Sequence, residues 1–485
     1  MDNKNGIYDA RTLGKPRMFI LGVQHMFAMF GATILVPILT GLDVSTTLLM
    51  AGLGTLLFHV LTKFKVPAFL GSSFAFLGGY GAVKGLAPKG ADPATMLPYA
   101  CLGVACAGLV YLVLALIIKG IGVERVMRFF PPVVTGPIII AIGLGLAPTA
   151  VKNCTYNWFL AFIALAVVIV FNIWGRGMAK IVPIIIGLLT AYGVGLILYF
   201  IADANPNLIN DVPWLFASPQ FDDAGNVVKY VPIFDFSGLH SIIDNIGSGH
   251  IFGSDGLIGA PLNWDRTVFG GVDWSEGNLI ASSIIAIVPI SLATMMEHIG
   301  DISAIGSTVG KNYIADPGLH RTLMGDGLAT TLASLFGGPA NTTYGENTGV
   351  LALSKVYDPR VVRIAAFFAV GISFFPIVST LIGSIPTAVI GGISFVLYGM
   401  ISAIGVRNVV ENKVDFTKSR NLIIAAVILV CALGLGDDTV KFSIGSANIS
   451  LSALAVASIA GIVLNAVFPG KDYSFKTNGK YDGEQ

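Results

Sequence analysis

Residues 339–349 read PANTTYGENTG and interrupt a long apolar part of the chain. The stretch carries one carboxylate, two amides and three threonine hydroxyls, while its proline and two glycines disfavour an uninterrupted helix. Inside a membrane, unwound polar backbone is tolerated only where protein buries it or where it lines a cavity. A carboxylate at such a place marks a functional site. If the chain spans a membrane, this stretch therefore predicts a broken span at a binding site.

The composition indicates a membrane protein with many spans. Of the 485 residues, 54% are hydrophobic and 12% are charged, whereas a soluble domain carries about 25% charged residues. The net charge of +1 gives no sign of a nucleic-acid partner. The four cysteines lack the spacing of a metal site and are interpreted as small core residues.

Apolar segments long enough to cross a membrane, or short and interrupted, number fourteen. They are 18–39, 46–62, 66–83, 96–118, 129–148, 157–174, 178–201, 279–300, 322–337, 343–354, 361–383, 386–405, 421–436 and 448–468. The third and the tenth are the interrupted ones, and the tenth contains most of the opening stretch.

The basic residues predict the orientation of these spans. Most of the 29 Lys and Arg residues fall in loops on the same side as the two termini, and basic loops favour the cytoplasm. We therefore expect a multi-pass protein of the cell membrane with both termini cytoplasmic. The long segment 202–278 then lies outside, either as a partly ordered lid or hairpin or as a functional loop.

Two short echoes suggest an internal repeat. PAFLGSSF at 67–74 aligns with PANTTYGE at 339–346, and PPVVTG at 131–136 aligns with PTAVIG at 386–391. Both echoes are seven spans apart, and an odd offset inverts the second copy relative to the membrane. Inverted repeats with paired broken spans are typical of secondary transporters and indicate where the substrate binds.

Ionisable groups inside the spans point to proton chemistry. Glu297 and Asp301 are four residues apart and share a helix face. Because two carboxylates on one face repel each other, one of them is expected to hold a proton near neutral pH. Such a carboxyl can take up a proton on one side and release it on the other. Asp301 is alternatively a helix-end residue that reaches water.

Three further groups are open to more than one interpretation. His25 lies mid-span and either makes an interhelical hydrogen bond, with Gln24 or a serine, or takes part in the site or in coupling. Asp326 either pairs inside the bundle or is functional, and pairing is favoured. His298 points away from Glu297 on its helix, so packing or a hydrogen bond is favoured for it.

The two broken spans supply the other half of the expected site. Backbone N–H groups after Ser73 and around Gly345 can meet a substrate carbonyl, and Phe74 offers an aromatic face. Glu297 and Glu346 are acceptors. This inventory fits a planar molecule with alternating N–H and C=O groups, and it disfavours an anion.

Five motifs then carry a resemblance to a known family. They are QHMFAMFGAT at 24–33, LGSSFAF at 70–76, EHIG at 297–300, DPGLHR at 316–321 and NTTYGEN at 341–347. The chain resembles the nucleobase/ascorbate transporter family, most closely its bacterial uracil-permease branch. The family signature [QEP]-N-x-G-x4-T-[RKG] is met by residues 346–355, with Ser354 in place of the usual threonine.

The resemblance implies an all-α fold of fourteen spans in a seven-plus-seven inverted repeat, with short strands in spans three and ten. It implies a core domain that moves against a gate domain. The implied parts are core at 1–118 and 279–384, gate at 119–201 and 385–468, an extracellular insert at 202–278, and a cytoplasmic tail at 469–485.

The resemblance also implies a function and the residues that perform it. Glu297 and Glu346 would accept the ring N–H groups of uracil, and backbone N–H groups near Phe74 and Gly345 would meet its carbonyls. Ala32 and Tyr344 would line the pocket. Uracil would enter with protons, handled by Asp301, Glu297 or His25, with no cofactor and no enzymatic step. Membrane lipid would surround the protein, and a homodimer is left open.

One departure keeps alternatives open. Asp301 stands where the uracil permeases used for comparison often carry histidine, and aspartate there resembles the purine-transporting branches. A xanthine-type purine permease is therefore the alternative. A sulfate-type anion transporter is less favoured, because two carboxylates would repel its substrate.

Overall fold

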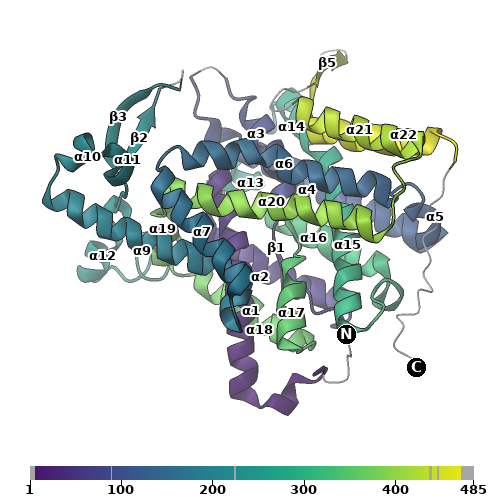
Figure 1. The fold of residues 1–485 in the computed structure, drawn as a ribbon, viewed down its shortest axis with the longest axis horizontal. Coiled ribbons are helices and arrows are strands. Elements are labelled where there is room, and N and C mark those ends of the chain that lie inside the picture. Colours follow the sequence, from purple (N-terminus) through teal and green to yellow (C-terminus); the bar gives the residue numbers. More distant parts are fainter. Residues whose placement is uncertain (1–5, 89, 223–224, 436–439, 445–446, 471–485) are drawn as a thin grey trace. The chain divides into compact units, whose positions relative to one another are not determined.

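The computed structural model describes residues 6–88, 90–222, 225–435, 440–444 and 447–470, and the chain is mostly helical (Figure 1). It divides into two compact units. The larger comprises Met1–Gly145, Pro261–Ser373 and Ile401–Gln485, and the smaller comprises Leu146–Ala260 and Phe374–Met400. The division falls inside two helices, α6 (Pro132–Cys154) and α20 (Thr387–Glu411).

The larger unit contains most of the helices in the described part of the chain. They are α1 (Lys15–Thr40), α2 (Val44–Leu61), α3 (Leu77–Lys84), α4 (Leu97–Ile121), α5 (Val123–Met127), α13 (Val268–Gly271), α14 (Gly277–Ile287), α15 (Ser291–Val309), α16 (Leu319–Leu335), α17 (Glu346–Ser354), α18 (Pro359–Ser373), α21 (Ser419–Gly434) and α22 (Ala453–Val467). Its strands are β1 (Leu70–Ser72), β4 (Asn341–Thr343), β5 (Val440–Ile444) and β6 (Ala447–Leu451).

The smaller unit combines membrane-type helices with part of the predicted insert. Its elements are α7 (Trp158–Trp174), α8 (Met178–Ile181), α9 (Pro183–Ala204), α10 (Leu208–Asp211), α11 (Pro213–Phe216), β2 (Ala217–Phe221), β3 (Val227–Pro232), α12 (Ser237–Gly247) and α19 (Pro376–Gly383). Strands β2 and β3 pair antiparallel, so segment 202–278 does contain a hairpin. The predicted core and gate divide the chain at other residues, and that assignment stays a prediction.

Seven helices in the described part of the chain are long and apolar enough to cross a membrane. They are Lys15–Thr40, Val44–Leu61, Pro93–Ile121, Pro132–Cys154, Pro183–Ala204, Gly277–Val309 and Thr387–Glu411. Shorter helices occupy the other predicted segments, among them α7, α16, α17, α21 and α22. The chain is therefore a multi-pass membrane protein, while the count of fourteen spans stays a prediction.

The first pair of sequence echoes lies side by side. Strand β1 pairs antiparallel with β4, in the register Leu70↔Thr343, Gly71↔Thr342 and Ser72↔Asn341. Each strand is three residues long and runs on into a short helix, α3 after β1 and α17 after β4. The two interrupted segments thus meet, while the inverted repeat and their assignment to spans three and ten stay predictions.

Helices α2 and α16 pack closely on each other beside these strands. A Cβ on Gly325 would lie 2.6 Å from Cδ2 of Phe58, and a Cβ on Gly54 would clash with the Asn341 amide. Glycine at both positions therefore lets the helices approach one another and the strands. A buried apolar cluster fills this region and includes Phe58, Val66, Leu70, Ile302, Ile305, Ala329 and Leu351.

Residues 7–13, called the N-terminal strap below, lie against the loop after α17. Two backbone hydrogen bonds join Ile7 of the strap to that loop. Ile7 N donates to Lys355 O and Tyr357 N donates to Ile7 O, both at 2.8 Å. At the next residue, the Tyr8 hydroxyl donates to the last carbonyl of α15, at Val309 (2.6 Å). The strap therefore links the ends of α15 and α17.

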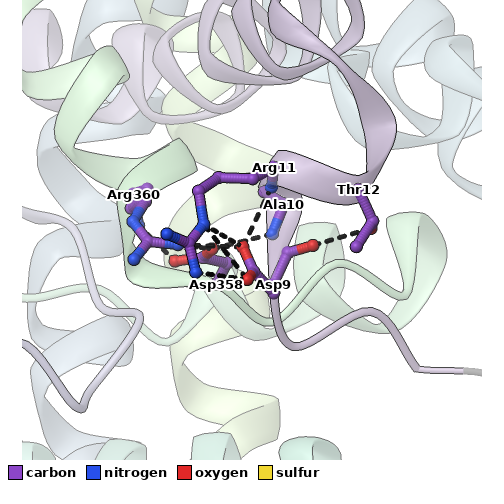
Figure 2. Close-up of polar contacts among 6 residues, drawn as sticks. All are labelled: Asp9, Ala10, Arg11, Thr12, Asp358 and Arg360. Atoms are coloured by element: carbon purple, nitrogen blue, oxygen red, sulfur yellow. Dashed lines mark hydrogen bonds and ion pairs between the residues drawn. The ribbon is translucent and has the colours of Figure 1, made fainter.

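Charged side chains also fasten the strap to the loop after α17 (Figure 2). Asp358 is buried and accepts from the backbone N–H of Ala10 at 2.8 Å, and Arg360 donates to both Asp9 (2.9 Å) and Asp358 (3.1 Å). The hydrogen bonds that Arg11 donates hold the pKa of the Asp9 carboxyl well below its usual value.

Candidate functional site

A cavity of about 520 Å³ lies in the larger unit, where β1, β4 and α15 meet the start of α6 and the end of α20. Its first wall is the pair of broken segments and the helix that follows the second one. That wall is formed by Ser72, Ser73, Phe74, Thr342, Thr343, Tyr344, Gly345 and Thr348. Helix α15 forms the second wall with one face, from Met296 to Thr308.

Five of the predicted site residues line this cavity. They are Phe74, Glu297, Asp301, Tyr344 and Gly345. Phe74 and Tyr344 are buried, and the two carboxylate residues are half-buried, one turn apart on α15. A Cβ on Gly345 would lie only 2.6 Å from Oδ1 of Asp301. Glycine at 345 therefore leaves the Asp301 carboxylate its place beside the start of α17.

The other predicted site residues lie elsewhere or outside what is described. Ala32 is buried in α1 and does not line the cavity, although the next residue, Thr33, accepts a hydrogen bond from the Ser72 hydroxyl at 2.8 Å. Glu346 is the first residue of α17, and its side chain lies outside the described part. Its role as an acceptor stays a prediction.

His25 supports the broken segments instead of lining the cavity. The Asn347 amide donates to the carbonyl of Pro67 at 2.6 Å, so its Oδ1 faces His25 Nδ1 at 3.1 Å. Since that oxygen only accepts, His25 carries its proton on Nδ1. The geometry gives the buried hydrogen bond of the first interpretation, but its partner is Asn347 and not Gln24 or a serine. A coupling role for His25 stays a prediction.

Tyr344 is fixed from two sides. Its hydroxyl donates to the carbonyl of Ser72 at 2.8 Å, and its ring lies over Gly71, where a Cβ would be 2.6 Å from Cε2. The missing side chain at Gly71 therefore makes room for the ring. This contact joins the two broken segments next to the cavity.

Asp326 and His298 hold the end of β4 in place by hydrogen bonds to Thr343. Asp326 Oδ1 accepts from the backbone N–H of Thr343 at 2.7 Å and from its hydroxyl at 2.8 Å. The Thr343 hydroxyl gives its only proton to Asp326, so His298 Nδ1, 3.0 Å away, must donate to it. Asp326 thus pairs inside the bundle, and His298 makes a hydrogen bond, one of the two alternatives favoured for it.

Two hydroxyls at the cavity were not singled out from the sequence. Ser73 Oγ and Thr348 Oγ1 line it, are buried, and have no hydrogen-bond partner among the described residues. Leaving a buried polar group unpaired costs roughly 1–3 kcal/mol. Both are therefore candidates to bind polar atoms of a ligand. The signal in the sequence is their position, with Ser73 near the end of the first echo and Thr348 two residues after the second.

Comparison with known proteins gives the family. The sequence model of the Permease family, the nucleobase/ascorbate transporters, matches residues 16–440. The chain belongs to this family. A permease moves its substrate across a membrane without converting it, so the expectation that the chain is not an enzyme is confirmed.

Similar proteins cover nearly the whole permease. It is 38% identical to the uracil permease of Bacillus caldolyticus, over 96% of this chain and 94% of that protein. The uracil permease of Bacillus subtilis is also 38% identical, over 92% and 91%. The putative pyrimidine permease RutG of Escherichia coli is 35% identical, over 93% and 89%.

Solved structures show the fold that the permease shares. The transmembrane domain of the cyanobacterial bicarbonate transporter BicA superposes with a TM-score of 0.59 at 14% identity, covering 94% of this chain and 99% of that one. The murine anion transporter Slc26a9 gives a TM-score of 0.53 at 10% identity, covering 93% and 67%. The permease therefore has the fold of these membrane transporters.

The remaining walls of the permease's cavity were missed by reading the sequence. Met127, Phe130, Ile139 and Ile401 make it apolar on one side, and Arg407, Asn408, Glu411 and Asn412 add a polar stripe from the end of α20. The spacing of that stripe, one helical turn, was its only signal. From Glu297 to Thr308, α15 lines the cavity over about 16 Å.

The lining of this cavity combines an acceptor, a ring and hydroxyls. Glu297 offers carboxylate oxygens, Phe74 a ring face, and Ser73 and Thr348 offer hydroxyls that can donate or accept. These groups are suited to a flat ligand rich in N–H and C=O groups.

Proposed function

We propose that the permease imports uracil together with protons. The observation that carries the proposal is the cavity that brings Glu297 and Phe74 together with the start of α17. Relatives named uracil permease, matched over more than nine-tenths of both chains, support it. The anion transporters share the fold alone, and the carboxylates at this cavity disfavour an anionic substrate.

In this proposal the ring of uracil lies against Phe74. Glu297 accepts one ring N–H. Glu346 accepts the other, a role assigned to it because it is the first residue of the family signature. Charge-assisted hydrogen bonds of this kind are roughly twice as strong as neutral ones. Backbone N–H groups near Phe74 and Gly345 meet the two carbonyls. The hydroxyls of Ser73 and Thr348 complete the set.

Proton coupling is assigned to the carboxyl pair on α15. Glu297 and Asp301 are one turn apart and half-buried, and two such groups disfavour being ionised together. One proton shared between them would let substrate binding and proton binding support each other. The place of Asp301 beside Gly345 supports this role. His25 remains the other candidate, acting through Asn347.

The transport cycle is proposed to move the core against the gate, within fourteen spans arranged as an inverted repeat. The antiparallel pairing of β1 with β4 supports that repeat. Both termini are placed in the cytoplasm, the membrane lipid surrounds the spans, and a homodimer is compatible with the proposal. The proton is the only coupling species, with no cofactor.

Labelled uracil uptake into proteoliposomes tests the proposal. An excess of unlabelled uracil should abolish uptake, while xanthine, hypoxanthine and sulfate should leave it nearly unchanged. Stronger competition by xanthine than by uracil would instead make the chain a purine permease. Competition by sulfate would overturn the assignment of the cavity to a nucleobase.

A further inference from the structure

The segment leading into β1 depends on side chains for its backbone hydrogen bonds. Strand β1 has one neighbouring strand, β4, so its other edge needs partners. In the apolar interior of a membrane protein an unpaired backbone group costs several kcal/mol. Two residues of α2 act here: His59 Nε2 lies 2.9 Å from the carbonyl of Ala68, and Thr55 Oγ1 accepts from the N–H of Leu70 at 2.9 Å.

The second strand is held in the same way by the helix that precedes it. On α16, Thr330 donates to the carbonyl of Asn341 at 2.9 Å, and Asp326 accepts from the N–H of Thr343 at 2.7 Å. In both helices the two polar residues are four positions apart. They therefore lie one turn apart on one helix face. Each strand of the site thus has a two-point clamp.

The chemistry of His59 is set by its partner. A carbonyl oxygen only accepts, so the proton of the neutral imidazole must be on Nε2. His59 is fully buried, and its Nδ1 has no hydrogen-bond partner among the described residues. The ring proton is therefore used to hold Ala68.

The tie at Ala68 matters because β1 is only three residues long. An extended chain advances about 3.3 Å per residue, so a shift at Ala68 is passed along the strand to Ser73 and Phe74. Those two residues line the cavity. Displacements of about 1 Å are enough to weaken a binding site strongly.

We propose that His59 is a positioning residue for substrate binding, which fixes the first broken segment through the Ala68 carbonyl. The inference rests on the proposed function for its transport readout, and on the fold alone for a second readout. His59 on α2 then has the same role for β1 that Asp326 on α16 has for β4.

Three substitutions separate the hydrogen bond from the bulk of the ring. His59→Gln can place an amide N–H where Nε2 lies, His59→Asn is too short to do so, and His59→Leu has no donor. Thr62→Val is the matched control, because the buried Thr62 hydroxyl, at the end of α2, donates to the Phe58 and His59 carbonyls of that helix and not to the segment around Ala68. Uracil KM and maximal rate are measured in proteoliposomes with equal amounts of inserted protein.

The expected result is a rise in KM of about tenfold for His59→Leu and His59→Asn, with wild-type KM for His59→Gln and Thr62→Val. In hydrogen exchange of the purified protein without substrate, peptides covering 68–76 should exchange faster in the Leu and Asn variants only. Wild-type KM in His59→Leu, or no difference between the Gln and Asn variants, would overturn the proposal. Absence of uracil uptake by the wild type would count against the proposed function alone, because the exchange data still test the clamp.

Discussion

Asp326 Oδ1 accepts two hydrogen bonds from one residue, the backbone N–H and the hydroxyl of Thr343, at 2.7 and 2.8 Å. Both residues are buried, Asp326 on α16 and Thr343 at the end of β4. Thr343 is directly followed by Tyr344 and Gly345, which line the cavity. The carboxylate therefore holds the strand that presents the second half of the site.

Asp326→Ala should destabilise the permease and weaken uracil binding. The substitution leaves two buried donors of Thr343 without an acceptor, at roughly 1–3 kcal/mol each. The melting temperature of the purified protein should fall, and the shift that uracil produces in it should shrink. Asp203→Ala, at an exposed position of α9, is the control and should match the wild type. An unchanged melting temperature in Asp326→Ala would show that the bonds to Thr343 are dispensable.

Gly71→Ala should raise the KM for uracil. The new Cβ would lie 2.6 Å from the Tyr344 ring and 2.8 Å from Thr33 Oγ1, so the ring must move. Overpacking of this kind costs roughly 1–3 kcal/mol of folding stability. If the ring relieves it by moving at the cavity, the part of that cost paid on binding raises the KM, about tenfold for each 1.4 kcal/mol. Gly78→Ala is the control, since no atom lies within 4 Å of its Cβ position. Equal KM values in the two variants would contradict the packing described for Tyr344.

Asn465→Ala should alter transport from a distance, through the apolar wall of the cavity. Asn465 is buried in α22, donates to the carbonyls of Arg128 and Phe129 at 3.1 and 3.3 Å, and accepts from Arg420 at 2.7 Å. Phe130 and Met127, on either side of those carbonyls, line the cavity. The maximal rate or the KM of uracil uptake should change severalfold, with exposed Asn207→Ala as the control. Wild-type kinetics in Asn465→Ala would mean that the apolar wall keeps its position without the hydrogen bonds from Asn465.

Asp358→Ala should release the N-terminal strap. The buried carboxylate accepts from Ala10 and Arg360, so its loss unties the strap from the loop after α17. Trypsin should then cleave after Arg11 faster than in the wild type. Asp9→Ala, whose carboxylate is more exposed, should show a smaller effect. Equal cleavage rates in wild type and Asp358→Ala would contradict the role given to Asp358.

The strap should be insensitive to pH in the physiological range. Arg11 holds the pKa of Asp9 below its ordinary value of 3.8, so the stabilisation is complete above that value and is lost as the pH falls towards the lowered pKa. Tryptic cleavage after Arg11, corrected for the enzyme's own pH dependence with a model peptide, should be the same at pH 6 and pH 8. Faster cleavage at pH 6 would place another titrating group in the strap.

The sequence predicted the residues whose types are unusual for their surroundings. Residues 339–349 were found because a carboxylate and amides are costly inside an apolar span, and 67–74 because it aligns with them. The two segments do pair. Glu297 and Asp301 were found because carboxylates inside spans are costly. Gly345, which lies beside Asp301, was found because it belongs to residues 339–349.

Contacts between distant segments could not be predicted in this way. His59 looks like any polar residue near a helix end until Ala68 is placed beside it. The polar stripe of α20 from Arg407 to Asn412 lines the cavity only because that helix is brought to α15, about 100 positions away. Ala32 is buried and does not line the cavity, and the bond from the Ser72 hydroxyl goes to the carbonyl of its neighbour Thr33.

The most direct test of uracil import coupled to protons is uptake of labelled uracil into proteoliposomes under an imposed inward proton gradient. The wild type should accumulate uracil above the outside concentration, and a protonophore should abolish the accumulation. Glu297→Gln, with equal protein inserted, should lose nearly all of it. Accumulation that ignores the protonophore, or normal accumulation by Glu297→Gln, would contradict the account.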